Sequence, residues 1–222
     1  MIQRLYHFLR RSDALDDLRH QWLKVSEFND LNDPFELLGV ELSIPANRLI
    51  FKSAEERVAK RTGVLCFSQC SRNALLWSHY AEKHKGMCLG FDVEAHLLTP
   101  ITYATERLLL EEDGLHSDED FEQFVQQLMF TKFNGWSYEE EVRVSVPLNQ
   151  RDNHDKLFIR RFGDGIELKE VIVGHRCDCQ RQEIQDAITG LTGVKIEKAR
   201  LAFKSFEVVN RKGGLRTTRH SR

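Results

Sequence analysis

The sequence predicts an α+β protein. Segments with strand-like apolar patterns outnumber the helical ones, and the two kinds do not alternate strictly along the chain, as they would in a doubly wound sheet. The composition agrees, because 41% hydrophobic and 30% charged residues among 222 describe an ordinary globular protein long enough to bury a core.

Short apolar runs bounded by turn residues predict the strands. One run follows Gly63 and ends at Ser68, and another follows Gly86 and ends at Asp92. The Gly163-Asp-Gly165 segment predicts a turn between two later strands. In chain order, the expected strands cover residues 4–8, 22–26, 63–68, 87–92, 99–103, 136–147, 156–162, 171–173, 194–199 and 202–209.

Capping residues predict where three helices begin. Ser12 is the expected N-cap of a helix that runs to Arg19, and Ser71 that of a helix that ends at Gly86. Ser117 and Asp120 are spaced nearly as in a capping box. Two further helices are expected over residues 54–61 and 180–189.

Helical spacing also predicts buried faces. After Ser71, the residues expected to face inward together are Leu75, Leu76, His79, Tyr80 and Lys83. After Ser117, the expected core stripe is Phe121, Phe124, Val125, Leu128 and Met129.

The chain is expected to form one domain over residues 1–209, because it contains no internal repeat and no linker rich in Pro or Gly. Residues 210–222 are expected to be a flexible basic tail. This tail is either a solvated terminus or a nucleic-acid contact. It carries five basic residues and no acid, namely Arg211, Lys212, Arg216, Arg219 and Arg222.

Several classes of protein lose support from what the sequence lacks. No apolar run reaches the roughly 20 residues that span a bilayer, and no signal-peptide pattern opens the chain, so we expect a cytoplasmic protein without membrane contact. The five cysteines agree with a reducing compartment, and their spacing does not match a zinc site, so no structural metal is expected. Glycine-rich phosphate loops, dinucleotide fingerprints and nucleophile elbows are also missing.

The stretch from Trp136 to Pro147 carries the most informative pattern. In a strand, Glu139, Glu141 and Arg143 would share one face, because successive side chains point in opposite directions. One interpretation is an antiparallel strand with this face in water, where Arg143 pairs with Glu141 across solvent. The other is a cleft wall that presents a Glu-x-Glu pair to a substrate.

Several motifs resemble a bacterial family catalogued as the domain of unknown function numbered twenty-nine seventy-one. They are Phe28-Asn-x-x-Asn-Asp-Pro-Phe-Glu36, Cys66-Phe-Ser68, Trp77-Ser-His-Tyr80 with His84-Lys-Gly86, Lys132-x-x-x-Trp136-x-Tyr-Glu-x-Glu-x-Arg143 and Glu170-Val-Ile-Val-Gly174. The resemblance covers about residues 4–209 and implies no particular activity.

A second resemblance, to the ADP-ribosyltransferases, implies a fold and a mechanism. Its basis is the order of a strand with His7, a strand ending at Ser68, a helix with Tyr80, and Tyr138-Glu-Glu-Glu-Val142. The implied fold is a split two-sheet β core with flanking helices. The implied activity is NAD-dependent ADP-ribosyl transfer or NAD cleavage, with a setting in bacterial conflict or phage defence.

The same resemblance implies residue roles. Glu141 is the expected catalytic acid, and Glu139 orients the acceptor. His7 would hold the ribose on the adenosine side of NAD, while Ser68 and Tyr80 line the nicotinamide pocket. The remaining residues expected to contact NAD are Tyr138, Arg143 and Asn32.

Two other functions stay open at this point. One is a non-catalytic module that binds a nucleotide or nucleic acid in the same cleft, with the basic tail gripping phosphates. The other is a metal-dependent nuclease that uses Asp33, Glu139 and Glu141, although no ligand spacing supports it.

Overall fold

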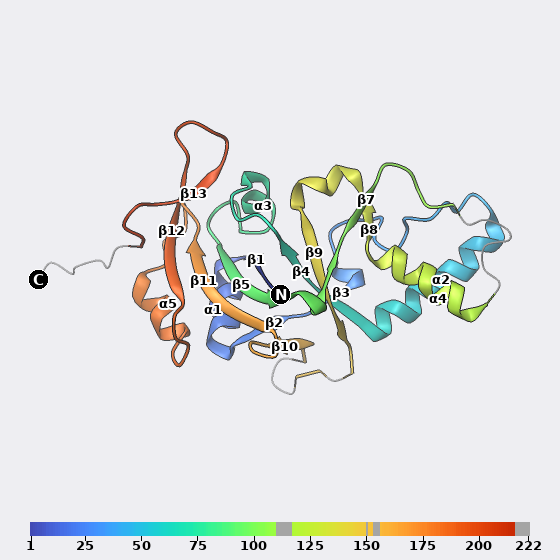
Figure 1. Ribbon diagram of the computed structural model, residues 1–222, viewed down its shortest axis with the longest axis horizontal. Helices are drawn as coiled ribbons and strands as arrows, with labels where there is room; N and C mark the ends of the chain where they lie inside the picture. The colour runs from blue at the N-terminus through green and yellow to red at the C-terminus, as the bar shows by residue number, and fades with distance from the viewer. Residues whose placement is uncertain (110–116, 150, 153–155, 216–222) are drawn as a thin grey trace, which may run out of the picture. The chain divides into compact units, whose positions relative to one another are not determined.

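The computed structural model describes residues 1–109, 117–149, 151–152 and 156–215 of an α+β chain (Figure 1). The chain forms two compact units, each assembled from separate stretches. Unit 1 contains Met1–Lys24, Phe67–Leu97 and Arg160–Arg222, and unit 2 contains Val25–Cys66 and Leu98–Ile159. The expected domain over residues 1–209 therefore covers all of unit 2 and unit 1 as far as residue 209.

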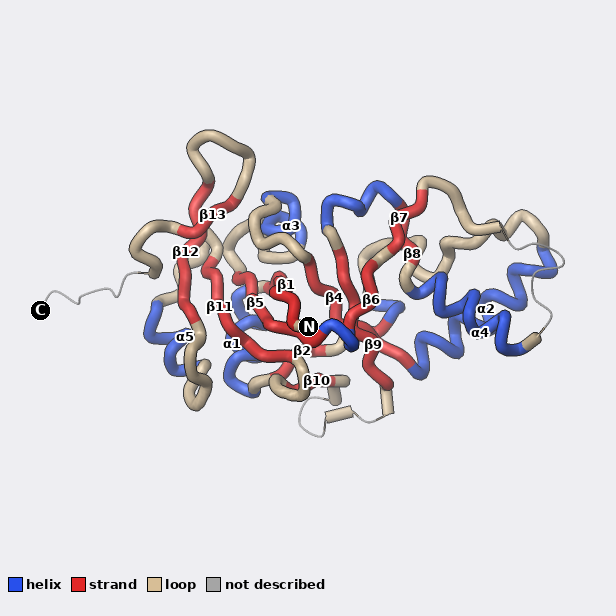
Figure 2. The backbone as a smooth tube through the Cα atoms, viewed as in Figure 1, coloured by secondary structure: helices blue, strands red, loops and turns tan. Residues whose placement is uncertain are grey.

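Unit 1 is built on a mixed sheet (Figure 2). Its strands β1, β5 and β11 pair antiparallel, whereas β11 and β12 run parallel and are joined through helix α5. The order is β13-β12-β11-β5-β1. The bounds are β1 Ile2–Leu9, β5 Met87–Glu94, β11 Ile166–Val173, α5 Arg181–Ala187, β12 Lys195–Leu201 and β13 Val208–Asn210.

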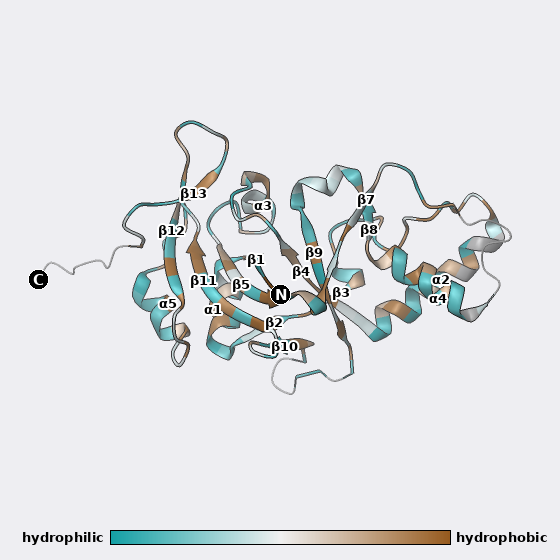
Figure 3. Ribbon diagram, in the orientation of Figure 1, coloured by the Kyte–Doolittle hydropathy of each residue, from teal (hydrophilic) through white to brown (hydrophobic). Residues whose placement is uncertain are grey.

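The middle of this sheet is buried because its strands are apolar on both faces. In β5, six of eight residues are buried, which is typical of a central strand covered on two sides. Helices α1 and α5 contact each other, and hydrophilic colour covers much of α5 (Figure 3). The remaining elements of unit 1 are α1 Arg11–His20, β2 Trp22–Lys24, α3 Ala74–His79, η2 Ala95–Leu97 and β10 Ile159–Arg161, whose first residue belongs to unit 2.

Unit 2 carries the candidate site. Strand β4 lies between β3 and β9, β6 follows β9, and β7 pairs with β8 in a separate parallel ladder. The last two residues of β4 belong to unit 1. The bounds are β3 Ser26–Glu27, η1 Phe28–Asp30, α2 Pro45–Arg61, β4 Thr62–Ser68, β6 Leu98–Pro100, β7 Thr102–Ala104, α4 Asp118–Met129, β8 Thr131–Phe133, η3 Asn134–Glu139 and β9 Glu141–Pro147.

Helices α2 and α4 lie side by side and share a hydrophobic core (Figure 1). The predicted cap of α4 is confirmed, because the Ser117 hydroxyl accepts a hydrogen bond from the Asp120 N–H at 3.1 Å. The predicted apolar stripe is also confirmed, since Val125, Leu128 and Met129 are buried and the two phenylalanines pack against the same clusters.

Several element boundaries differ from those expected. Helix α1 begins at Arg11 after an N-cap at Arg10, so Ser12 lies inside it. Helix α2 begins at Pro45, a residue whose fixed φ suits the first turn. Residues 99–103 contribute to two strands, β6 and β7, instead of one.

The helix after Ser71 is shorter than expected and turned differently. Asn73 caps it by accepting from the Leu75 N–H, and it ends at His79. The predicted inward face is wrong, because Leu75, His79 and Lys83 are exposed. The buried side chains nearby are Leu76, Trp77 and Ala81. The physical reason is length: a helix of six residues has too few turns for a stripe with helical period.

The described start of the basic tail is held by unit 1. The Arg211 N–H donates to the Lys198 carbonyl, and Arg181 donates to the carbonyl of Leu215. Arg211 and Lys212 are exposed, while Arg216, Arg219 and Arg222 lie outside the described residues. None of the described helices is long and apolar enough to cross a membrane.

Candidate functional site

The expected strand over residues 136–147 begins only at Glu141. Residues Asn134–Glu139 form the 3-10 helix η3, and Glu140 adopts a left-handed conformation with φ of 46°. The Glu140 N–H donates to the Ser137 carbonyl, which closes the turn before β9. The expectation that Glu139 shares one face of a strand with Glu141 and Arg143 was therefore wrong, because Glu139 lies in η3 and a left-handed residue separates it from β9.

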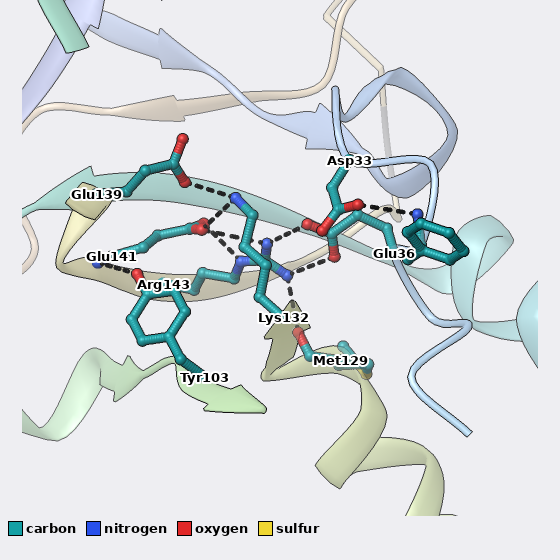
Figure 4. A network of polar contacts seen from close by, with 9 residues as sticks. Asp33, Glu36, Tyr103, Met129, Lys132, Glu139, Glu141 and Arg143 are labelled. Carbon is teal, nitrogen blue, oxygen red and sulfur yellow. Dashed lines mark hydrogen bonds and ion pairs between the residues drawn. The ribbon is translucent and has the colours of Figure 1, made fainter. Parts of the chain in front are cut away.

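The two glutamates are nevertheless brought together by Lys132 on β8 (Figure 4). The Lys132 Nζ lies 2.6 Å from Glu139 Oε2 and 2.8 Å from Glu141 Oε2. All three residues are buried, with at most 5% of each exposed. The lysine ammonium also lies 5.2 Å from the centre of the Trp136 ring, a cation–π distance.

Arg143 on β9 is the centre of the same network and is fully buried. Its guanidinium carries five N–H donors, and each has an acceptor. Two contacts reach Glu141, at 2.7 Å from Nε and 3.4 Å from Nη2. Two reach Glu36, at 3.0 Å from Nη1 and 2.5 Å from Nη2, and the fifth reaches the Met129 carbonyl at 2.8 Å.

The network has a formal charge of −1, because three glutamates surround one lysine and one arginine. We call these five residues, Glu36, Lys132, Glu139, Glu141 and Arg143, the carboxylate network. Buried ions need such pairing, because an isolated charge in a medium of low dielectric is very costly. The interpretation of this face as solvent-exposed is wrong, and so is the pairing of Arg143 with Glu141 across solvent.

Burial opposes the ionised form of Glu141, but the charges of Arg143 and Lys132 outweigh it and lower its pKa to about 2. Burial also opposes the charge on Lys132, whose pKa is nonetheless raised by its two glutamates. For Glu36 the balance is reversed: burial raises its pKa despite the Arg143 contact. Glu141 is thus an ionised carboxylate throughout the physiological range.

Two more side chains, those of Tyr103 and Cys66, lie at the edge of the carboxylate network. The Tyr103 hydroxyl accepts a hydrogen bond from the Glu141 N–H at 2.8 Å, which anchors the start of β9. Burial raises the Tyr103 pKa to about 12, so the phenol stays protonated. Burial and the nearby Glu141 raise the pKa of the Cys66 thiol well above its usual value, so this cysteine is not a reactive thiolate.

The other predicted site residues are divided between the two units. Asn32 and Tyr138 belong to unit 2, where Asn32 is exposed and Tyr138 is half-buried. His7, Ser68 and Tyr80 belong to unit 1. The His7 ring lies 5.7 Å from that of Phe67, the Ser68 hydroxyl closes a turn with Cys70, and Tyr80 is the C-cap of α3. Their roles toward NAD stay predictions.

Glu36 and Lys132 complete the network, yet no role was predicted for either. Both stand in motifs of the first family resemblance, and Lys132 follows the apolar end of α4. Membership in these motifs and the position of Lys132 after α4 were the only signals in the sequence that pointed to these two residues. Helix and strand periods do not link Glu36 to Arg143, because the two are 107 residues apart. The described residues contain no group of three or more His, Cys, Asp or Glu suited to a metal, which gives the nuclease hypothesis no support.

The comparisons with known proteins add no relative, because no family model, no curated protein and no solved structure matches this chain.

Proposed function

We propose that the protein cleaves NAD at the bond between nicotinamide and ribose, as an ADP-ribosyltransferase or an NAD hydrolase. The observation that supports this most is the Glu139–Lys132–Glu141 arrangement, two buried carboxylates bridged by one ammonium at 2.6 and 2.8 Å. With this activity we also propose a split two-sheet core similar to that of ADP-ribosyltransferases.

The charge of the network suits this chemistry. When the bond from the ribose C1′ to nicotinamide breaks, the electron pair leaves with nicotinamide and positive charge builds on the sugar. A fixed carboxylate facing that charge stabilises the transition state. In other enzymes, deleting a single preorganised group of this kind raises the activation barrier by about 3 to 4 kcal/mol. A nucleophile, water or an acceptor side chain, then bonds to C1′ and loses its proton.

The pKa of Glu141 restricts its role. With a pKa of about 2 it stays ionised and does not collect protons near neutral pH, so its part is electrostatic. Glu139 is bridged to the same lysine and would orient the acceptor. Both carboxylates are buried, so we assign the contact with the ribose to a bound state in which the substrate displaces part of the Lys132 pairing.

Release of nicotinamide from NAD by the purified protein tests the proposal. We expect turnover by the wild type and its loss in Glu141→Gln, which keeps the shape of the side chain and removes its charge. Glu140→Gln is the matched control, because Glu140 is the exposed neighbour of both network glutamates. His7→Ala tests the predicted ribose contact separately.

The result that would contradict the proposal is the absence of both NAD binding and turnover in folded wild type, with and without cell extract as a source of acceptors. Turnover that survives Glu141→Gln with full rate would remove this residue from the site. Thermal unfolding of each variant shows whether a loss of turnover reflects chemistry or stability.

A non-catalytic module that binds a nucleotide or nucleic acid is the alternative. The observation that favours it is that every donor of Arg143 already has a protein acceptor, as in a network that supports a binding surface. Under this alternative, NAD or a nucleic acid binds without turnover, and deletion of residues 210–222 weakens nucleic-acid binding and its salt dependence.

A further inference from the structure

A pocket of about 370 Å³ lies in unit 2, next to the carboxylate network. Residues 33–35, which follow η1, form one side of it, and residues of β8 and η3 form the other. Its lining residues are Asp33, Pro34, Phe35, Phe133, Gly135, Trp136 and Tyr138.

Asp33 is the one acidic residue among these lining residues, and it is incompletely paired. Only 3% of it is exposed. Its Oδ1 accepts the Phe35 N–H at 2.9 Å (Figure 4), whereas the buried Oδ2 has no hydrogen-bond partner among the described residues. A buried polar atom left unpaired costs about 1 to 3 kcal/mol, and more when it is charged. A carboxylate accepts but does not donate, so a ligand that satisfies it must bring N–H or O–H donors.

The remaining walls are aromatic. Phe35 and Phe133 are 46% and 54% exposed, and Trp136 and Tyr138 are half-buried. Gly135 lets the Phe133 ring lie against the backbone, because a Cβ at this position would come within 2.6 Å of that ring. Exposed and half-exposed rings of this kind offer flat faces on which a planar ligand stacks.

Charge decides which part of a nucleotide such a pocket takes. Asp33 adds a carboxylate beside a network whose formal charge is already −1. A phosphate placed against Asp33 would be repelled by it, whereas a base that donates hydrogen bonds would not. The Arg107 guanidinium, 5.2 Å from the centre of the Phe35 ring, brings a positive charge to the Phe35 side of the pocket. A lone guanidinium would satisfy Asp33 but would leave most of the four aromatic faces in water.

We infer that this pocket binds a nucleobase through an edge with adjacent N–H donors, of the guanine type. The ring N–H and the neighbouring amino group would meet the two oxygens of Asp33, and the base would stack on the aromatic walls. The inference goes beyond NAD cleavage and does not depend on it, because binding of a base is measured without NAD.

Calorimetric titration of the full chain with guanosine tests the inference. Inosine lacks the amino group, adenosine lacks the ring N–H, and methylguanidinium lacks the stacking surface, so each should bind more weakly than guanosine. Asp33→Asn keeps the shape of the side chain and the acceptor for the Phe35 N–H, but it should weaken the binding of guanosine about tenfold or more. Asp30→Asn, at an exposed aspartate three residues earlier, should leave binding unchanged.

Phe133→Ala provides a second variant, since this exposed ring is a pocket wall whose loss leaves the buried core in place. This variant should also bind guanosine more weakly than the wild type. Three results would overturn the inference: no guanosine binding by folded wild type, equal binding of guanosine and adenosine, or methylguanidinium binding without guanosine binding. The last would make the pocket a site for a cationic side chain.

Discussion

Replacing Arg143 by methionine should destabilise unit 2 more than any exposed substitution. The change keeps a long flexible side chain but removes a fully buried cation that donates to Glu36, Glu141 and the Met129 carbonyl. The formal charge of the network falls from −1 to −2, and the Glu36 carboxylate loses the only cation with which it forms an ion pair among the described residues.

The expected magnitude follows from the burial. Breaking a buried ion pair by deleting one partner costs about 3 to 5 kcal/mol, because the other charge stays buried without compensation. At about 2 to 4 °C per kcal/mol for a chain of this length, the melting temperature should fall by about 6 to 20 °C. Arg151→Met is the control: Arg151 pairs with Glu27 at 3.0 Å on the surface, where such a pair contributes at most about 1 kcal/mol.

Urea unfolding followed by tryptophan fluorescence and circular dichroism measures these differences. The double variant Arg143→Met with Glu36→Gln restores the formal charge of −1, so it should be more stable than Arg143→Met alone by about 1 kcal/mol or more. A loss below about 1 kcal/mol in Arg143→Met, or a double variant less stable than the single one, would refute the view that buried charge pairing holds this network together.

Two further predictions concern the network's acidity and a helix cap. Because the Glu141 pKa is about 2 in the folded protein and near 4.5 when unfolded, its contribution is complete above pH 4.5 and is lost as pH falls toward 2. The stability difference between wild type and Glu141→Gln should therefore shrink by about 3 kcal/mol over that range, and an unchanged difference would contradict the ionised assignment. Ser117→Ala should cost about 1 kcal/mol in urea unfolding by removing the N-cap of α4. Ser53→Ala, at an exposed position of α2, should cost less, and equal costs would argue against the cap.

Local patterns predicted the parts of the fold that depend on neighbouring residues. The α+β class, the strand ending at Ser68 and the capped helix after Ser117 all follow from apolar period and turn chemistry, and the structure contains each of them. The start of the short helix α3 was harder to predict, because Ser71 and Asn73 are both residue types that favour the N-cap position, and the structure uses Asn73.

The candidate site was predictable only in part. The glutamates and Arg143 were identified from their motif, but the exposure of their face was not, because alternation is the same for a solvated strand and a buried one. The turn at Glu140 was not predicted for another reason. Glutamate has no preference for a positive φ, so nothing in the local sequence marks the interruption of the strand. Partners such as Glu36, far along the chain, are fixed only by the tertiary fold.

The division of the chain also sets an order in which its parts are completed during synthesis. Every stretch of unit 2 has been synthesised once residue 159 is made, whereas β5 must wait for β11, which begins at Ile166, before its second edge is covered. An apolar strand with an unpaired edge is prone to association with other chains. The nascent protein is therefore most vulnerable to aggregation between the appearance of β5 and that of β11, a window in which a chaperone would have the most to protect.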